Sequence, residues 1–257
     1  MAKEKDDKLY TETQTALLGE ENAKQMRKAA RKMRRFQKNQ ELRDTKLYSL
    51  GGEIFSSITH GITAAAGIAA LVLGVIFAAH NPAMGALAIV GIVIFGASAF
   101  LGFTISTVYH GLKINTGKRV MRVLDHCSIY SLIAGTYTAF CFIALPNWIG
   151  FTIFGANWTL AIVGTVLTAI DRKKFHGFAF ACYLIMGWIV VVFIVPLVRA
   201  IGFGWAWWFL LGGGIAYTLG AAVYKLKGKY VHGIWHLFTL AGLTLHFFSI
   251  VAITLNW

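Results

Sequence analysis

The chain alternates seven long apolar stretches with short polar connections. The stretches run over 54–79, 84–110, 123–145, 148–170, 175–198, 205–224 and 232–255. Each is long enough to cross a hydrocarbon layer about 30 Å thick, because a helix rises about 1.5 Å per residue. Odd and even positions are both apolar within each stretch, whereas the strands of membrane barrels alternate apolar and polar side chains. The pattern predicts an all-α integral membrane protein, with a bundle of seven transmembrane helices over 46–257.

Composition supports the membrane assignment. Hydrophobic residues make up 57% of the 257, charged residues 14%, and the mean hydropathy is +0.62, values outside the range of ordinary soluble domains. The first 50 residues contain no apolar core of the kind found in cleavable signal peptides, so we expect the first spanning helix to remain as an anchor. We interpret 1–45 as a basic cytoplasmic tail that is partly helical or disordered. No CxxC spacing occurs, and we interpret the three cysteines as small core residues: Cys127, Cys141 and Cys182.

Lysine and arginine are distributed unevenly between the two sides of the predicted bundle. Thirteen of the 24 precede residue 51, and Arg199 alone falls on the opposite side. The others lie around the second, fourth and sixth connections: Lys113, Lys118, Arg119, Arg122, Arg172, Lys173, Lys174, Lys225, Lys227 and Lys229. The positive-inside rule therefore predicts a multi-pass protein of the cell membrane, with a cytoplasmic N-terminus and an external C-terminus.

The formal charge of +13 does not indicate nucleic-acid binding. Most of the excess lies in the loops just named and in the tail segment "KQMRKAARKMRRFQK". We expect this segment to lie near anionic lipid headgroups, where each Lys or Arg contributes about 1 kcal/mol. A partner-binding role for the segment stays open. The expected partners are membrane lipids, with no nucleic acid.

Polar chemistry gathers near the cytoplasmic face of the predicted bundle. Asp125 lies near the start of the third helix, where an ionised carboxylate is costly unless it is partnered or hydrated. His110 ends the second helix, and His232 and His236 begin the seventh, so the predicted topology brings all four to one membrane level. His232 and His236 are spaced i, i+4, on one helical face, and both could ligate one ion.

Three imidazoles with an open fourth position are typical of catalytic zinc. A lone HxxxH is weak evidence, and here Gly233 occupies the place of the glutamate found in HExxH proteases. Asp125 could supply the general base, or it could orient a histidine from behind. Ser106 lies one turn before His110, and its hydroxyl could donate to a developing oxyanion or hydrogen-bond to its own i−4 carbonyl.

Other polar residues of the predicted helices receive weaker assignments. Glu53, Ser57 and His60 form a row along the first helix, either a headgroup-level patch or a support for the site. His126 points about 100° away from Asp125 around its helix, so we expect it not to share the same ion. No role is assigned to His80, His176 and His246.

Four motifs in this order carry a family resemblance: "GEIFSSITHGI", "STVYH", "LDHCSIYSLIAGTYTAF" and "HGIWHLF". Together they resemble the hemolysin III family, the bacterial branch of the progestin and adipoQ receptor family. The likeness covers about 46–257 and extends to a superfamily of seven-helix membrane hydrolases that includes alkaline ceramidases and adiponectin receptors. Two positions depart from the usual pattern, Ala139 in place of proline and Ser56 in place of asparagine.

The resemblance implies zinc ligands at His110, His232 and His236, a water-orienting acid at Asp125 and a site serine at Ser106. It implies hydrolysis of a lipid amide with a long acyl chain. Two alternatives remain: a pore-forming hemolysin or channel, and a membrane-state receptor whose zinc is structural. Polar residues that collect near one face do not favour a pore, because a conducting path is normally lined by polar groups through its full depth.

Overall fold

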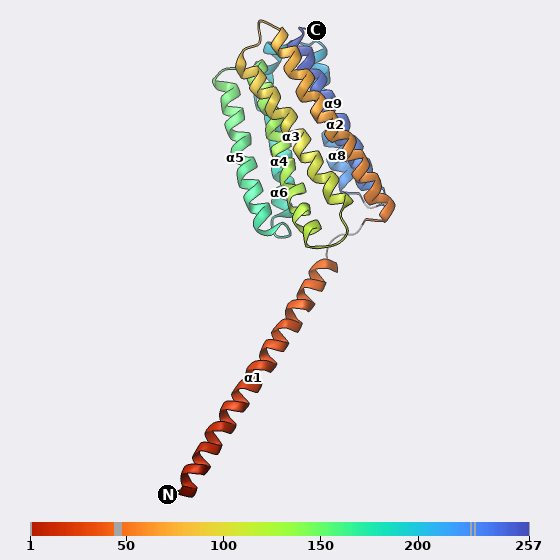
Figure 1. The fold of residues 1–257 in the computed structure, drawn as a ribbon. Helices are drawn as coiled ribbons and strands as arrows, with labels where there is room; N and C mark the ends of the chain where they lie inside the picture. The colour runs from red at the N-terminus through yellow and green to blue at the C-terminus, as the bar shows by residue number, and fades with distance from the viewer. Residues whose placement is uncertain (1, 44–47, 227, 229, 257) are drawn as a thin grey trace. The chain divides into compact units, whose positions relative to one another are not determined.

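The computed structural model describes residues 2–43, 48–226, 228 and 230–256, and within these ranges it contains helices and no strand. The helices are α1 (Ala2–Arg43), α2 (Leu50–His80), α3 (Ala86–Gly111), α4 (Thr116–Ala144), α5 (Trp148–Asp171), α6 (His176–Trp188), the 3₁₀ helix η1 (Ile189–Phe193), α7 (Ile194–Ile201), α8 (Trp205–Tyr224) and α9 (Val231–Thr254) (Figure 1). The chain divides into two compact units, Met1–Leu47 and Tyr48–Trp257. The first contains the single helix α1, and the second is a helix bundle.

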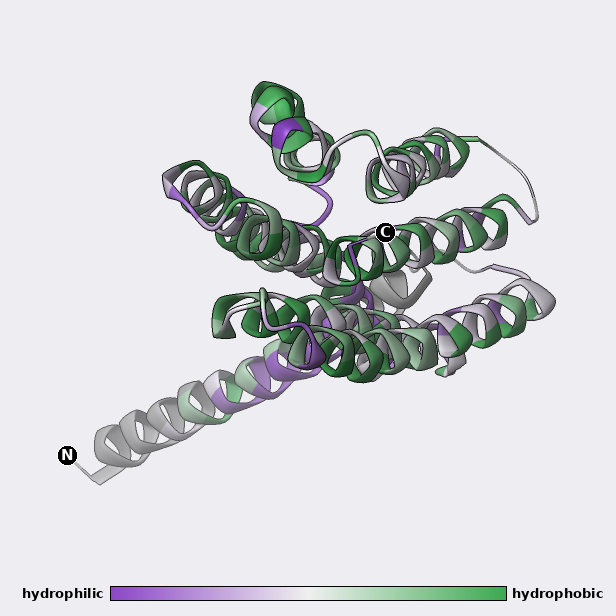
Figure 2. Ribbon diagram, turned by 90° about the horizontal axis from the view of Figure 1, so that it is seen from above, coloured by the Kyte–Doolittle hydropathy of each residue, from purple (hydrophilic) through white to green (hydrophobic). Residues whose placement is uncertain are grey.

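Seven helical segments of the second unit are long and apolar enough to cross a membrane, with α6, η1 and α7 together forming the fifth. The bundle is coloured as predominantly hydrophobic in Figure 2. Large apolar side chains are exposed on its surface, among them Leu101 at 56%, Ile162 at 62% and Ile170 at 71%. Such exposure is unfavourable in water but is expected where lipid tails are the solvent. The predicted all-α membrane bundle is therefore confirmed, while its orientation across the membrane stays a prediction.

The helices that hold the candidate site pack closely. Neighbouring pairs are α2 with α3, α3 with α4, and α9 with both α2 and α8. A Cβ atom on Gly67 of α2 would lie 2.8 Å from the backbone nitrogen of Phe100, and one on Gly91 of α3 would lie 3.1 Å from the Cα atom of Ala139. These glycines let backbones approach as they do at small-residue interfaces in membrane helices. The result is a tightly packed group of helices, α2, α3, α4 and α9.

Two helical segments differ from the sequence prediction, one in where it begins and one in its continuity. α4 begins at Thr116 rather than at 123, because the Asn115 side chain accepts a hydrogen bond of 2.8 Å from the Lys118 N–H and caps the helix. The fifth span is interrupted by η1 instead of running as one helix. Pro196 lies just after this 3₁₀ segment, and its ring disfavours a regular α-helical turn immediately before it. The three cysteines are buried, as predicted.

Candidate metal centre and its cavity

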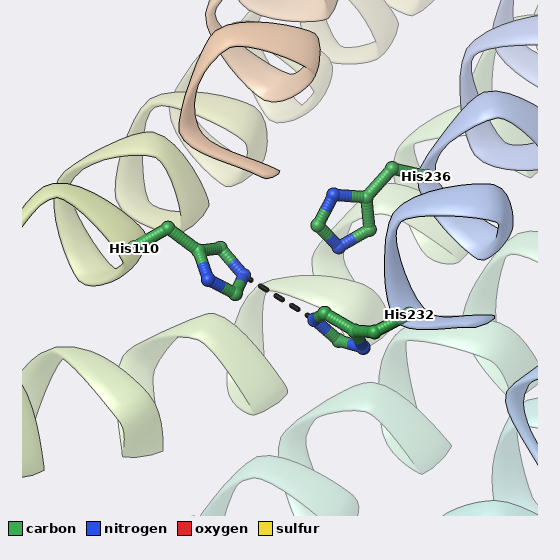
Figure 3. A group of neighbouring side chains, drawn as sticks. All are labelled: His110, His232 and His236. Carbon is green, nitrogen blue, oxygen red and sulfur yellow. Dashed lines mark hydrogen bonds between the residues drawn. The ribbon is translucent and has the colours of Figure 1, made fainter. Parts of the chain in front are cut away.

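Three histidines from two helices converge at one end of the bundle. The last turn of α3 carries His110, and the first turns of α9 carry His232 and His236. One ring nitrogen from each lies within 4.8 Å of the others, so the three could hold a metal ion. Figure 3 shows the rings facing one another, with the Nε2 atoms of His110 and His232 separated by 3.3 Å. The sequence prediction brought these residues together, and the structure places them together.

A carboxylate lies behind His110 and holds the ring from its Nδ1 side. The Nδ1–H of His110 donates to Oε2 of Glu53 at 2.7 Å, because an ionised carboxylate can only accept. In a neutral, metal-binding His110 the lone pair would be on Nε2, which faces the other two histidines. A carboxylate that holds the far nitrogen of a metal-binding histidine is the usual second layer of such sites.

A hydroxyl plays the same part for His236. The Thr59 hydroxyl donates to the backbone carbonyl of Phe55 at 2.9 Å, so its oxygen can accept from Nδ1 of His236 at 3.4 Å. The other ring nitrogen, Nε2, is fully buried and has no hydrogen-bond partner among the described residues. A buried polar atom left unpaired costs about 1–3 kcal/mol, and a metal ion would remove that cost by accepting its lone pair.

The distance between His110 and His232 matches that between two ligands of a tetrahedral ion. Two nitrogens each about 2.0–2.1 Å from zinc and at the tetrahedral angle are about 3.4 Å apart, close to the 3.3 Å between His110 and His232. Neutral imidazoles suit zinc, copper, iron and nickel alike. The donor set therefore fits a divalent metal with an open position and does not by itself select zinc.

Aromatic rings surround His232. Tyr48 stacks on its imidazole with ring centroids 4.3 Å apart and an interplanar angle of 11°, and Trp235 also stacks on it at 5.5 Å. Burial raises the pKa of the Tyr48 phenol, which therefore stays neutral at physiological pH. The stacked rings restrict His232 to a narrow range of orientations.

Asp125 and Ser106 lie beside the histidines. The Asp125 side chain interacts by hydrogen bond with the Ser106 hydroxyl, and electrostatically with His110. Ser106 is 4% exposed and the Asp125 side chain 17%, and both line the same cavity. The Ser106 hydroxyl therefore lies next to the Asp125 carboxylate, and its role at the site stays a prediction.

A second charged residue behind His110 was missed by the sequence reasoning. The Lys118 ammonium donates to Oε1 of Glu53 at 2.9 Å and to the Leu112 carbonyl at 3.0 Å, and only 3% of its side chain is exposed. The sequence counted Lys118 as one of several loop cations. Because α4 begins seven residues early, this lysine instead lies in its first turn and faces the bundle, a placement that no sequence pattern signalled.

Of the remaining polar residues, His60 lies against the histidine cluster, while Ser57 and His126 bond to backbone carbonyls. His60 is buried against His236 with ring centroids 3.7 Å apart, and neither of its nitrogens has a hydrogen-bond partner among the described residues. Ser57 instead donates to the Thr107 carbonyl at 3.1 Å and links α2 to α3. The Nδ1–H of His126 donates to the Arg122 carbonyl at 2.8 Å.

A cavity of about 310 Å³ extends from the histidines into the bundle. Its lining includes Asp125, in the first half of α4, and Leu145, just beyond the end of that helix, which are separated by about 30 Å of helix. Between them the walls are mainly apolar side chains of α4, α6, η1, α7 and α8. The cavity is also lined by His246, to which the sequence assigned no role, and by Tyr217. A cavity is formed by several helices, so no single stretch of sequence could have revealed it.

These observations define a seven-span membrane protein with a candidate three-histidine metal centre at the head of an elongated, mainly apolar cavity. The chain belongs to the hemolysin III family: the family described as "Haemolysin-III related" matches residues 48–247. Hemolysin-3 of Bacillus cereus is 39% identical over 201 residues, which cover 77% of this chain and 90% of that protein. The Hemolysin-3 homolog of Bacillus subtilis (strain 168) is 37% identical over 207 residues, covering 80% of this chain and 95% of the relative.

The family match includes all five residues predicted for the site and begins at residue 48. The helix α1, which ends at Arg43, lies outside it. The core of the protein can therefore be compared with its relatives, whereas α1 has to be understood from its own residues.

Proposed function

We propose that this protein is a zinc-dependent intramembrane hydrolase that cleaves a long-chain lipid amide. The observation that carries the proposal is the convergence of three imidazole nitrogens at the head of a long apolar cavity. A cavity of this shape suits an acyl chain, with the scissile amide placed beside the histidines. The proposed ligands are His110, His232 and His236.

The surrounding residues have the chemistry for hydrolysis. Bound zinc would supply a Lewis acid and lower the pKa of water at its open position to about 7. The Asp125 carboxylate would take the proton from the attacking water and return it to the leaving amine nitrogen. The Ser106 hydroxyl, which is hydrogen-bonded to Asp125 in the structure, would turn toward the amide carbonyl oxygen as negative charge develops there.

The charge distribution assigns a side to the reaction. Basic residues gather in the tail and in the connections at the histidine end of the bundle. By the positive-inside rule this end faces the cytoplasm, so the reaction would take place at the cytoplasmic leaflet. Substrate would then enter from that leaflet, with its polar headgroup near the histidines.

Two other functions fit parts of the data. The relatives' names favour a pore, yet the walls of the described cavity are mainly apolar, and its one carboxylate, Asp125, lies near the histidine end. A receptor with a structural metal is favoured by the buried Glu53–His110 pair, which would hold a structural ion equally well. The receptor hypothesis predicts that metal removal lowers the stability of the protein and that no lipid amide is hydrolysed.

Elemental analysis of the detergent-purified protein, combined with assays on a panel of long-chain lipid amides, tests the proposal. We expect a stoichiometric amount of zinc and measurable release of fatty acid. His110→Ala and His236→Ala should lose both, while His80→Ala should lose neither because His80 is exposed at the far end of α2. Bound zinc without turnover of any amide would favour the receptor, and vesicle conductance lost in the same variants would favour the pore.

A further inference from the structure

The helix α1 separates its charged and uncharged side chains within residues 18–35. Successive residues are rotated by about 100° around a helix. On this basis every charged side chain of the segment falls within one arc of about 160°. The members of this charged arc are Glu20, Glu21, Lys24, Arg27, Lys28, Arg31, Lys32, Arg34 and Arg35.

The opposite arc of the segment carries no charge. Its apolar members are Leu18, Ala23, Met26, Ala29, Ala30 and Met33. The three largest are strongly exposed, Leu18 at 60%, Met26 at 74% and Met33 at 58%. A shallow apolar face of this kind, opposite a basic face, is the signature of helices that lie in a membrane interface rather than across it.

We propose that residues 18–35 lie along the bilayer surface and bind anionic lipid headgroups. The seven basic residues would contact phosphate and other anionic groups, and the two methionines with Leu18 would enter the boundary between headgroups and acyl chains. Positive charge on one face matches the negative charge of such a surface. The segment would act as a second, charge-dependent membrane contact beside the seven spans.

The connection to the bundle favours lipid over other acidic partners. Fourteen residues separate Arg35 from Leu50, where the first span begins. Fully extended, they reach at most about 50 Å, so Arg35 stays within about 50 Å of the bilayer. A nucleic acid or a soluble acidic protein would satisfy the cations but would leave Met26 and Met33 exposed.

The test uses the full-length protein in nanodiscs of phosphatidylcholine alone or mixed with phosphatidylglycerol. An environment-sensitive fluorophore is attached at Met33→Cys on the apolar arc, or at Glu21→Cys on the charged arc as the matched position. The native cysteines are buried, and labelled parent protein supplies their background. Quenching by neutral acrylamide then measures how far each label is exposed to water.

We expect quenching at position 33 to fall severalfold in anionic nanodiscs only, and to stay unchanged at position 21. Raising the salt from about 0.1 M to about 1 M shortens the Debye length from about 10 Å to about 3 Å and should restore quenching. Arg27→Gln with Arg31→Gln should abolish the protection. The control pair Lys113→Gln with Lys174→Gln removes the same charge from exposed positions outside α1 and should preserve it.

Three results would overturn the proposal. Equal protection in neutral nanodiscs would show that headgroup charge is not recognised. Protection that depends on protein concentration would assign the apolar arc to a second copy of the chain. Full quenching at position 33 in every lipid composition would exclude a bilayer contact. Protection by an added acidic macromolecule and by no lipid would have the same consequence.

Discussion

Replacing Glu53 with glutamine separates two effects of one buried carboxylate. The Oε2 atom accepts from His110 Nδ1 at 2.7 Å, and Oε1 accepts from Lys118 Nζ at 2.9 Å. Glutamine keeps the size of the side chain but removes its charge. Its amide must also present an NH₂ group toward one of the two donors, so at least one hydrogen bond is lost.

The effect on metal binding follows from the bond to His110. Loss of a carboxylate behind a metal-binding histidine typically weakens affinity 10- to 100-fold, or about 1.4–2.7 kcal/mol. The effect on stability follows from Lys118, whose side chain is 3% exposed. Leaving a buried charge without its partner costs about 3–5 kcal/mol, so Glu53→Gln should also destabilise the metal-free protein by an amount of this order.

A double variant distinguishes the two contributions. Glu53→Gln with Lys118→Met removes both buried charges and should recover most of the stability of the metal-free protein, while zinc affinity stays 10- to 100-fold weaker. Zinc affinity is measured by competition with a chromogenic chelator, and stability by thermal unfolding in the same detergent after zinc removal. Restoration of zinc affinity in the double variant would refute the reasoning, because Glu53 would then act through Lys118 and not through His110.

The other predictions concern catalysis, metal content and the cavity wall. Asp125→Asn should retain zinc by elemental analysis but lower amide hydrolysis about 10²- to 10⁴-fold, the range for loss of a general base. Chelation of zinc initially present at about 1,000 times its Kd should lower the free energy of unfolding by about 4 kcal/mol, seen as a fall in Tm. The Tyr137 hydroxyl donates to the Gly187 carbonyl at 2.7 Å and accepts from the Val190 N–H at 3.2 Å, so Tyr137→Phe should destabilise by about 0.5–1.5 kcal/mol per bond in denaturant titrations. The buried Tyr217 hydroxyl has no partner among the described residues, so Tyr217→Phe at the same cavity should leave stability unchanged or raise it.

The sequence predicted much of the arrangement because two of its signals are local. The span pattern and the loop charges order the helices, and the i, i+4 spacing of His232 and His236 places both on one face of α9. Together these signals brought His110 from another helix to the same level. The same reasoning predicted Glu53 only as part of a polar row, because its partners depend on helix rotation.

Features that depend on how the helices pack could not be predicted from local sequence patterns. Lys118 became a buried partner because the Asn115 cap starts α4 early, and an apolar window cannot register a cap. Pro196 was visible in the sequence, but an average over the span conceals the η1 interruption before it. The surroundings of His246 depend on side chains from several helices, so its position in the cavity wall followed only from the structure.

The two parts of the proposed site differ in how firmly the bundle holds them. The histidines stand on α3 and α9, which belong to the closely packed group with α2 and α4, and their far nitrogens are held by Glu53 and Thr59. The cavity wall is completed by α6, η1, α7 and α8, and α6 and α7 make few contacts with α5 and α8. Tight packing suits a metal centre, because ligands must stay within about 0.5 Å of their working positions. Sparse packing of α6 and α7 would suit the proposed acyl-chain compartment, since neither helix carries a proposed ligand, whereas α8 packs closely on α9. We therefore expect α2, α3, α4 and α9 to hold the proposed ligands rigidly, and α6 and α7 to adapt to different acyl chains.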